Sequence, residues 1–254
     1  MSALAIGGIV LACVFGGALF GMFLPALLPT DHLSANSKDV VKVATAMIAT
    51  LAALVIGLLI ASAKNSFDAK DSQFKHMAAH VILLDRVMAQ YGPETREARD
   101  LLRQMVITRL HQIWPDEKDG TVEAGALGEG GGVETIQVAL RGLAPQNDNQ
   151  RSLQASALQI SGDIAEARWL LLQEIRGSIQ WPFLAVLVFW LAVIFMSFGL
   201  SAPRNTTVII ALLVSALSVA GSIFLIVQMD QPYGGLIRIS SAPLHLALDE
   251  LGKP

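Results

Sequence analysis

Four long stretches of the chain carry no Asp, Glu, Lys or Arg, and they constrain the possible fold more than any other feature. They run over Met1–Thr30, Val43–Ala63, Gly177–Pro203 and Asn205–Met229. A helix of about 20 apolar residues, rising about 1.5 Å per residue, crosses the ~30 Å hydrocarbon core of a bilayer. One Asp, Lys or Arg at mid-span would cost about 2.5–3.5 kcal/mol. Four uncharged windows therefore predict four transmembrane helices in a lipid bilayer.

The composition of the whole chain agrees with a membrane protein. Hydrophobic residues make up 53% and charged residues 15% of the 254 residues, and the mean hydropathy is +0.54. Soluble globular proteins usually carry about 25% charged residues. The formal net charge is −3, and the sequence contains no basic arm or stripe. Nucleic acid is therefore disfavoured as a partner.

The four spans form two hairpins that a polar segment separates. We expect residues 1–63 to hold the first transmembrane hairpin, residues 64–180 a helical cytoplasmic domain, residues 181–229 the second hairpin, and residues 230–254 a cytoplasmic tail. Most of the Lys and Arg residues lie in the polar segment. The positive-inside rule then places this segment and both termini in the cytoplasm.

The polar segment is predicted to be mostly helical. Lys64–Gln90 contains no Gly or Pro, continues the second span, and repeats its apolar residues at helical spacing. The acidic, glycine-rich stretch 116–132 predicts a flexible loop. In the tail, Gly235–Ser240 alternates like a short strand. Further helices are expected over Glu94–Trp114, Val133–Leu143 and Asn149–Gln180.

No combination of residues indicates catalysis, a metal site or a cofactor site. His76 and His80 lie four residues apart on a predicted helix, a spacing that suits metal chelation, but the glutamate of a zinc-protease motif is missing and no third ligand can be assigned. The glycine-rich run 125–132 lacks the Gly-Lys-Ser/Thr of a phosphate loop. We therefore expect no catalytic residue, no metal and no cofactor, and the chain is not expected to be an enzyme.

The second span sorts its side chains by size. On one side of a helical projection lie large residues, namely Met47, Leu51, Leu54 and Leu58. On the other side lie Thr45, Ala49, Ala52 and Ile56, with Lys42 near the outer end. Large side chains suit lipid, whereas small ones suit either close helix packing or a narrow lumen. Periodicity alone leaves both interpretations open.

The other spans carry small or polar residues of the same kind. The first span contains the Gly17-xxx-Gly21 spacing, and the fourth contains Ser215, Ser218 and Ser222. Outside the spans, we expect Asp85 and Arg86 to pair with a neighbouring helix, and the tail to anchor against a neighbouring subunit.

Several motifs, taken in their order, resemble the bacterial bestrophin-like membrane proteins. The resemblance covers essentially the whole chain and depends on the order and spacing of the motifs. They are LPTDHLS at Leu28–Ser34, GLLIASA at Gly57–Ala63, LLDRVMAQYGPE at Leu83–Glu94, and MDQPYGGLIRISSAPL at Met229–Leu244. The aromatic constriction of animal bestrophins has no counterpart, because Val40–Ala63 contains no Phe, Tyr or Trp.

The resemblance implies an all-α, bestrophin-like fold with four transmembrane helices in two hairpins and a helical cytoplasmic extension. It also implies a homo-oligomer, with a pentamer favoured, that passes small ions through the bacterial inner (plasma) membrane. In such channels the second membrane helix of each subunit lines a central pore. The pore-lining residues would then be Lys42, Thr45, Ala49, Ala52 and Ile56. The alternative is a non-conducting scaffold or signalling protein whose cytoplasmic helices bind a partner.

Overall fold

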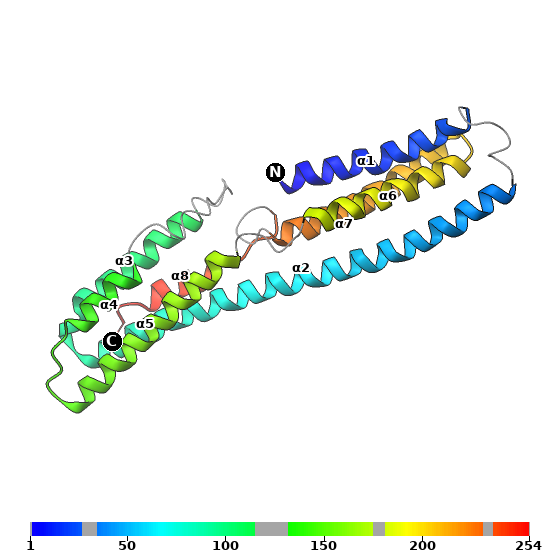
Figure 1. Ribbon diagram of the computed structural model, residues 1–254. Coiled ribbons are helices and arrows are strands. Elements are labelled where there is room, and N and C mark those ends of the chain that lie inside the picture. Colours follow the sequence, from blue (N-terminus) through cyan, green and yellow to red (C-terminus); the bar gives the residue numbers. More distant parts are fainter. Residues whose placement is uncertain (1, 27–34, 115–131, 175–180, 231–235, 254) are drawn as a thin grey trace. The chain divides into compact units, whose positions relative to one another are not determined.

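The computed structural model describes residues 2–26, 35–114, 132–174, 181–230 and 236–253, and the regular elements within these ranges are all helical (Figure 1). The chain divides into two compact units. The first, here called the membrane unit, comprises Met1–Ser66 and Ser178–Asp230, and the second unit comprises Phe67–Gly177 and Gln231–Pro254. Helix α2 contributes to both units.

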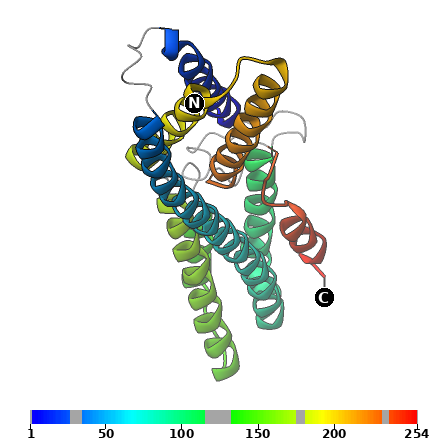
Figure 2. The same cartoon turned by 90° about the vertical axis from the view of Figure 1, so that its right-hand side faces the viewer.

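The membrane unit contains the four predicted spans, and each of them is a helix. Four helices among the described residues are long and apolar enough to cross a membrane, so this is a multi-pass, all-α membrane protein. Helix α1 lies beside α6 and α7 in both views (Figures 1 and 2). The bounds are α1 at Ala3–Phe23 followed by the short η1 at Leu24–Ala26, α2 at Ala35–Tyr91, α6 at Trp181–Ser201, and α7 at Thr206–Asp230.

Glycines allow α1 and α6 to approach closely. A Cβ atom added to Gly21 would clash with the carbonyl oxygen of Met196, and one added to Gly199 would clash with that of Ala18. At Gly17 an added Cβ would lie 2.8 Å from the carbonyl oxygen of Ala192. Lipid tails are as apolar as leucine, so such close packing is a main source of attraction between membrane helices. The Gly17-xxx-Gly21 spacing is therefore a packing surface.

The end of α1 is held by a residue from the loop between α6 and α7. The guanidinium of Arg204 donates from Nε (3.0 Å) and Nη2 (2.7 Å) to the carbonyl oxygen of Met22. The last carbonyl groups of a helix have no partner within the helix, and a cation near them also opposes the negative end of the helix dipole. Arg204 thus connects the two hairpins.

The second unit is a helical assembly with one apolar core. Buried side chains from each helix share this core, and Figure 2 shows α8 (red) beside α3 (green). The unit contains the C-terminal part of α2, the short η3 at Pro93–Thr95, α3 at Arg96–Ile113, α4 at Val133–Arg141, α5 at Asp148–Glu174, and α8 at Ala242–Glu250. The predicted helices of the polar segment are confirmed within a few residues of their ends, except that the end expected at Gln180 lies outside the described residues.

Between α2 and α3 the chain reverses at Gly92, whose φ of 133° is a conformation that side chains with a Cβ rarely adopt. Pro93 then starts the next turn with its fixed φ and without an N–H that would need an acceptor. The hydroxyl of Thr95 donates to the carbonyl oxygen of Met88 (2.6 Å), which satisfies one of the last carbonyls of α2. Local sequence chemistry thus explains this reversal.

The structure corrects one expectation for the tail. The short strand expected at Gly235–Ser240 is not formed, since residues 236–240 are irregular and no described segment offers a partner strand. An isolated strand leaves its backbone groups without ladder partners. The tail helix α8 packs on α3 of the same chain, where Leu244 and Ala247 are buried. Anchoring of the tail against a neighbouring subunit stays a prediction.

Two further expectations lie outside the described residues. The flexible loop predicted for 116–132 falls almost wholly there, and so does the junction at 175–180 that would join α5 to the third span.

Candidate functional site

An open groove lies between α2 and α6 in the membrane unit. Its volume is about 540 Å³. Four residues of α2 line one side of it, namely Lys42, Thr45, Ala46 and Ala49. Ser197, Phe198 and Ser201 of α6, with Ala202 directly after that helix, line the other side. Three of the five residues expected to line a pore therefore meet in one groove, and α6 adds two hydroxyl groups to it.

One hydrogen bond joins the two walls of the groove. The hydroxyl of Thr45 donates to Oγ of Ser197 over 3.0 Å, and Thr45 is buried. Burying a hydroxyl group without a hydrogen-bond partner costs free energy, and the bond between these two hydroxyl groups offsets that cost for both residues. The bond thereby links α2 to α6 at this level of the groove.

The other two predicted pore residues lie deeper in the membrane unit. Ala52 is buried and Ile56 is half-buried, and both pack on the core that α1, α6 and α7 share. The large residues on the opposite side of α2 are exposed, namely Met47, Leu51, Leu54 and Leu58. The sorting by size thus corresponds to two physically different faces, one covered by the subunit itself and one uncovered.

Lys42 lies at the rim of the groove. Its side chain is 64% exposed and its Nζ lies 3.4 Å from Oδ1 of Asp39, one turn earlier. An exposed pair of this kind contributes at most about 1 kcal/mol and is screened by salt. The ammonium group therefore remains accessible to ions at this rim.

Sequence reasoning missed the serines of α6 and selected those of α7. The hydroxyl groups of Ser215 and Ser218 donate back to carbonyl oxygens of their own helix, each over 2.9 Å. Ser197 and Ser201 instead line the groove. Their spacing of four residues puts them on one side of a helix and was the available signal.

A cluster of charged residues in the second unit holds the C-terminal tail. Asp85 accepts hydrogen bonds from Nε (2.7 Å) and Nη2 (2.9 Å) of Arg99 and from the backbone N–H of Gly252 (3.2 Å). Arg86 donates to Oε2 of Glu250 over 3.0 Å. The expectation that Asp85 and Arg86 pair with a neighbouring helix is confirmed, since Arg99 lies on α3 and Glu250 on α8.

These contacts shift two pKa values. The hydrogen bond from Arg99 to Asp85 raises the pKa of the Arg99 guanidinium. The hydrogen bond from Lys253, with the nearby charge of that ammonium group, lowers the pKa of the Glu250 carboxyl. Both shifts favour the charged forms, so the cluster is a structural clasp for the tail rather than a poised acid or base.

His76 and His80 do not gather further ligands in the part of the chain that the structure describes. In those ranges no group of three or more His, Cys, Asp and Glu side chains lies close enough to hold a metal ion.

Comparison with known proteins gives one result for the chain as a whole. A family model described as Bestrophin-like domain matches residues 12–244. No curated protein and no solved structure matches the chain. The match extends over both the membrane unit and most of the second unit, and so covers the α2–α6 groove.

Proposed function

Because the chain belongs to the bestrophin-like family, we propose that it is one subunit of an oligomeric channel that passes small ions passively across the membrane. Helix α2 of each subunit lines the conduction pathway, and a ring of five subunits, a pentamer, encloses it. The observation that carries the proposal is the α2–α6 groove, which collects Lys42, Thr45 and two serines in an otherwise apolar unit.

In this proposal the groove is the outer mouth of the pathway. The ammonium group of Lys42 attracts anions to the rim, and the hydroxyl groups of Thr45, Ser197 and Ser201 replace part of an ion's hydration shell. Ala49 leaves the space that a larger side chain would fill.

Ala52 and Ile56 form the constriction of the proposed pathway. Both side chains pack against the subunit's own core, and in the proposal this packing corresponds to the closed state. A narrow apolar passage of this kind stops ions because water does not fill it. Opening would require α2 to move away from the core, which the hydrogen bond between Thr45 and Ser197 opposes.

The proposed location is the bacterial inner membrane, with both termini and residues 64–180 in the cytoplasm. The excess of Lys and Arg in that segment supports the orientation. Lys42 and Arg204 then lie at the outer side.

Cysteine scanning along α2 tests the proposal. In a Cys13→Ala background, single cysteines replace Thr45 or Ala49 on the groove side and Met47 or Leu51 on the exposed side, and ion flux into proteoliposomes is measured before and after a charged thiol reagent. We expect the reagent to change the flux for the groove positions only, because the exposed positions face lipid.

The reverse pattern, with flux altered only from Met47 and Leu51, would show that the uncovered face of α2 lines the pathway and would contradict the assignment of residues. Absence of flux in the reconstituted wild-type protein would contradict conduction itself.

A non-conducting scaffold is the second candidate, and one observation favours it. The hydroxyl groups of Thr45 and Ser197 satisfy each other, and Ala52 is buried, so helix packing accounts for these positions of α2 without a pore. In that case the second unit would bind a partner. A monomer or dimer in detergent would support this candidate, whereas a ring would support the channel.

A further inference from the structure

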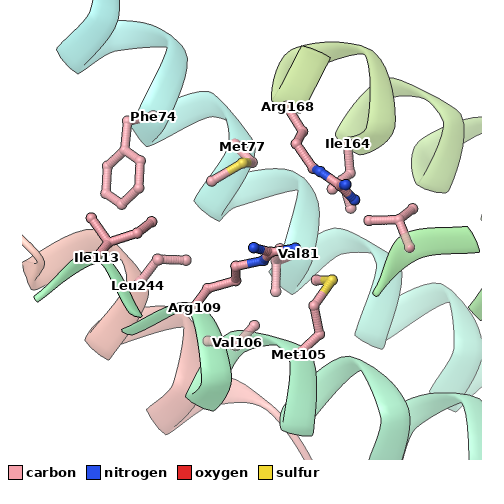
Figure 3. Close-up of a pocket in the computed structure, with 11 residues that line it drawn as sticks. Phe74, Met77, Val81, Met105, Val106, Arg109, Ile113, Ile164, Arg168 and Leu244 are labelled. Atoms are coloured by element: carbon pink, nitrogen blue, oxygen red, sulfur yellow. The ribbon is translucent and has the colours of Figure 1, made fainter. Parts of the chain in front are cut away.

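Two pockets of the second unit contain arginine side chains, and they differ in size and in the character of their walls. The smaller, of about 50 Å³, lies between α2, α3, α5 and α8 and has a mostly apolar wall. Figure 3 shows Arg109 and Arg168 among its apolar residues. A small apolar pocket does not favour a charged ligand, and Arg168 already has Glu134 as an ion-pair partner.

The larger pocket, of about 460 Å³, is open and lies where α2, the start of α3 and the C-terminal tail meet. We call it the α3–tail pocket. Leu251 and Gly252 form its side towards the tail. The remaining wall is largely polar, and its charged residues are Asp85 of α2 with Arg96, Arg99, Asp100 and Arg103 of α3. Three guanidinium groups and two carboxylates line the pocket, so its wall carries a net positive charge.

The three arginines follow one another at spacings of three and four residues, which places them on one face of α3. Their partners differ. Arg99 is neutralised by Asp85, to which it donates over 2.7 and 2.9 Å. Arg103 donates to the carbonyl oxygen of Leu251 over 3.4 Å, longer than most hydrogen bonds of this type. The exposed side chain of Arg96 has no hydrogen bond or ion pair with any residue in the described ranges.

Arg96 and Arg103 are therefore the cations that a ligand can engage. They lie seven residues, or about 10 Å, apart along the helix axis. A single small anion cannot stay close to both unless the two long side chains converge, whereas a ligand with two linked anionic groups can meet one arginine with each. Guanidinium groups bind phosphate through pairs of parallel hydrogen bonds.

The volume of the pocket also suits such a ligand. One water molecule needs about 10–15 Å³ of volume measured in this way, so the α3–tail pocket accepts a molecule many times larger than water. Because the pocket is open, a group attached to the phosphates can extend into solvent.

We propose that the α3–tail pocket binds a diphosphate group, either as free pyrophosphate or as part of a nucleoside diphosphate. One phosphate contacts Arg96 and the other contacts Arg103. The ligand also touches the tail, because Leu251 and Gly252 belong to the wall. The proposal does not depend on ion conduction, because the pocket lies wholly within the second unit.

Titration calorimetry with the purified full-length protein in detergent provides the test. The probes are pyrophosphate, ADP and inorganic phosphate, each in EDTA and at the same ionic strength set with sodium chloride. We expect pyrophosphate, ADP or both to bind at least about tenfold more tightly than inorganic phosphate, since only they can engage both arginines. Binding of pyrophosphate alone would identify the free ion as the ligand, and binding of ADP alone would identify the ester.

Three variants locate the site and predict changes of opposite sign. Arg96→Gln and Arg103→Gln each remove one exposed cation and should weaken binding of the preferred probe by about tenfold. Asp100→Asn removes the carboxylate that repels the ligand and should strengthen binding by about two- to fivefold. Arg151→Gln, which changes an exposed arginine on α5, is the control and should leave the affinity unchanged.

Three outcomes would overturn the proposal. The first is equal affinity for all three probes, or no binding of any of them. The second is an unchanged affinity in both Arg96→Gln and Arg103→Gln. The third is an equal loss of affinity in Arg151→Gln, which would show attraction to positive charge in general rather than to this pocket. Circular dichroism of each variant establishes that its helices are intact.

Discussion

Among single residues, Asp85 shows how a buried charge can stabilise the fold when all its partners are in place. Its carboxylate is buried and accepts two hydrogen bonds from Arg99 and one from the backbone of Gly252. The tail is thereby attached to α2 and α3 by charge-assisted hydrogen bonds, which are about twice as strong as neutral ones. Loss of the negative charge at this position should therefore lower the stability of the second unit.

Asp85→Asn should lower the stability of the second unit by roughly 3 kcal/mol, since the partly buried guanidinium of Arg99 would lose its counter-charge. In thermal unfolding this corresponds to a fall in Tm of roughly 6–12 °C. Asp148→Asn is the matched control, because Asp148 pairs with Arg151 while its side chain is 97% exposed. An equal fall in both variants would contradict the structural role of Asp85.

Glu250 makes the attachment of the tail depend on pH. Its pKa is lowered below the ordinary 4.5, chiefly by the hydrogen bond from Lys253. A group whose pKa is lower in the folded state contributes stability at neutral pH that is lost as the pH falls through the folded value. Hydrogen exchange at residues 251–253 should therefore speed up below about pH 4.5, after correction for intrinsic rates. Glu250→Gln should show the faster exchange already at pH 7.

Among the helices, α1 and α6 form the closest pair in the membrane unit. Their backbones meet at Gly21 and Gly199, where any side chain would strike the carbonyl group of the other helix. Helix α2 differs, because it meets the core through alanines and half-buried aliphatic residues and through one hydrogen bond to α6. The proposed opening movement therefore belongs to α2 rather than to the α1–α6 pair.

Gly21→Ala and Gly199→Ala should each destabilise the membrane unit by about 1–3 kcal/mol, because the added methyl group forces two backbones apart. Gly16→Ala provides the control, since an added Cβ at Gly16 meets no atom within 4 Å. Unfolding in a detergent titration measures all three. If Gly16→Ala were as harmful as the others, the close approach of α1 and α6 would not be the cause.

For the whole molecule, the proposed channel requires several copies of the chain around an axis. Four apolar helices establish membrane embedding, and the family match supports an oligomer. In a ring, every subunit would contribute one Lys42. A single ammonium group has a weak effect on nearby ions, but several of them would form a ring of positive charge at the mouth of the pathway.

Lys42→Glu should therefore shift the reversal potential in planar bilayers under a salt gradient towards cation selectivity. Lys42→Gln should give an intermediate value, and Arg151→Glu, which alters an exposed charge of the second unit, should leave the potential unchanged. An unaltered potential in Lys42→Glu would remove this residue from the pathway.

Local sequence was enough to predict the four membrane spans, the all-α class and most helix ends. Charge-free windows report the free energy of transfer into lipid, which is a property of each segment alone. The reversal at Gly92 and Pro93 also follows from local chemistry, because glycine permits a positive φ and proline lacks an N–H. The short strand at Gly235–Ser240 was predicted wrongly, since alternation of side chains does not supply a partner strand.

The contacts of each helix face could not be predicted in this way, because they depend on the packing of the folded chain. The helical projection grouped Thr45, Ala49, Ala52 and Ile56, but it did not show that Ser197, 152 residues away, accepts the hydrogen bond from Thr45. Such contacts depend on how two helices are rotated and packed against each other. Packing of this kind involves segments that are distant in the chain, so neither segment alone predicts it.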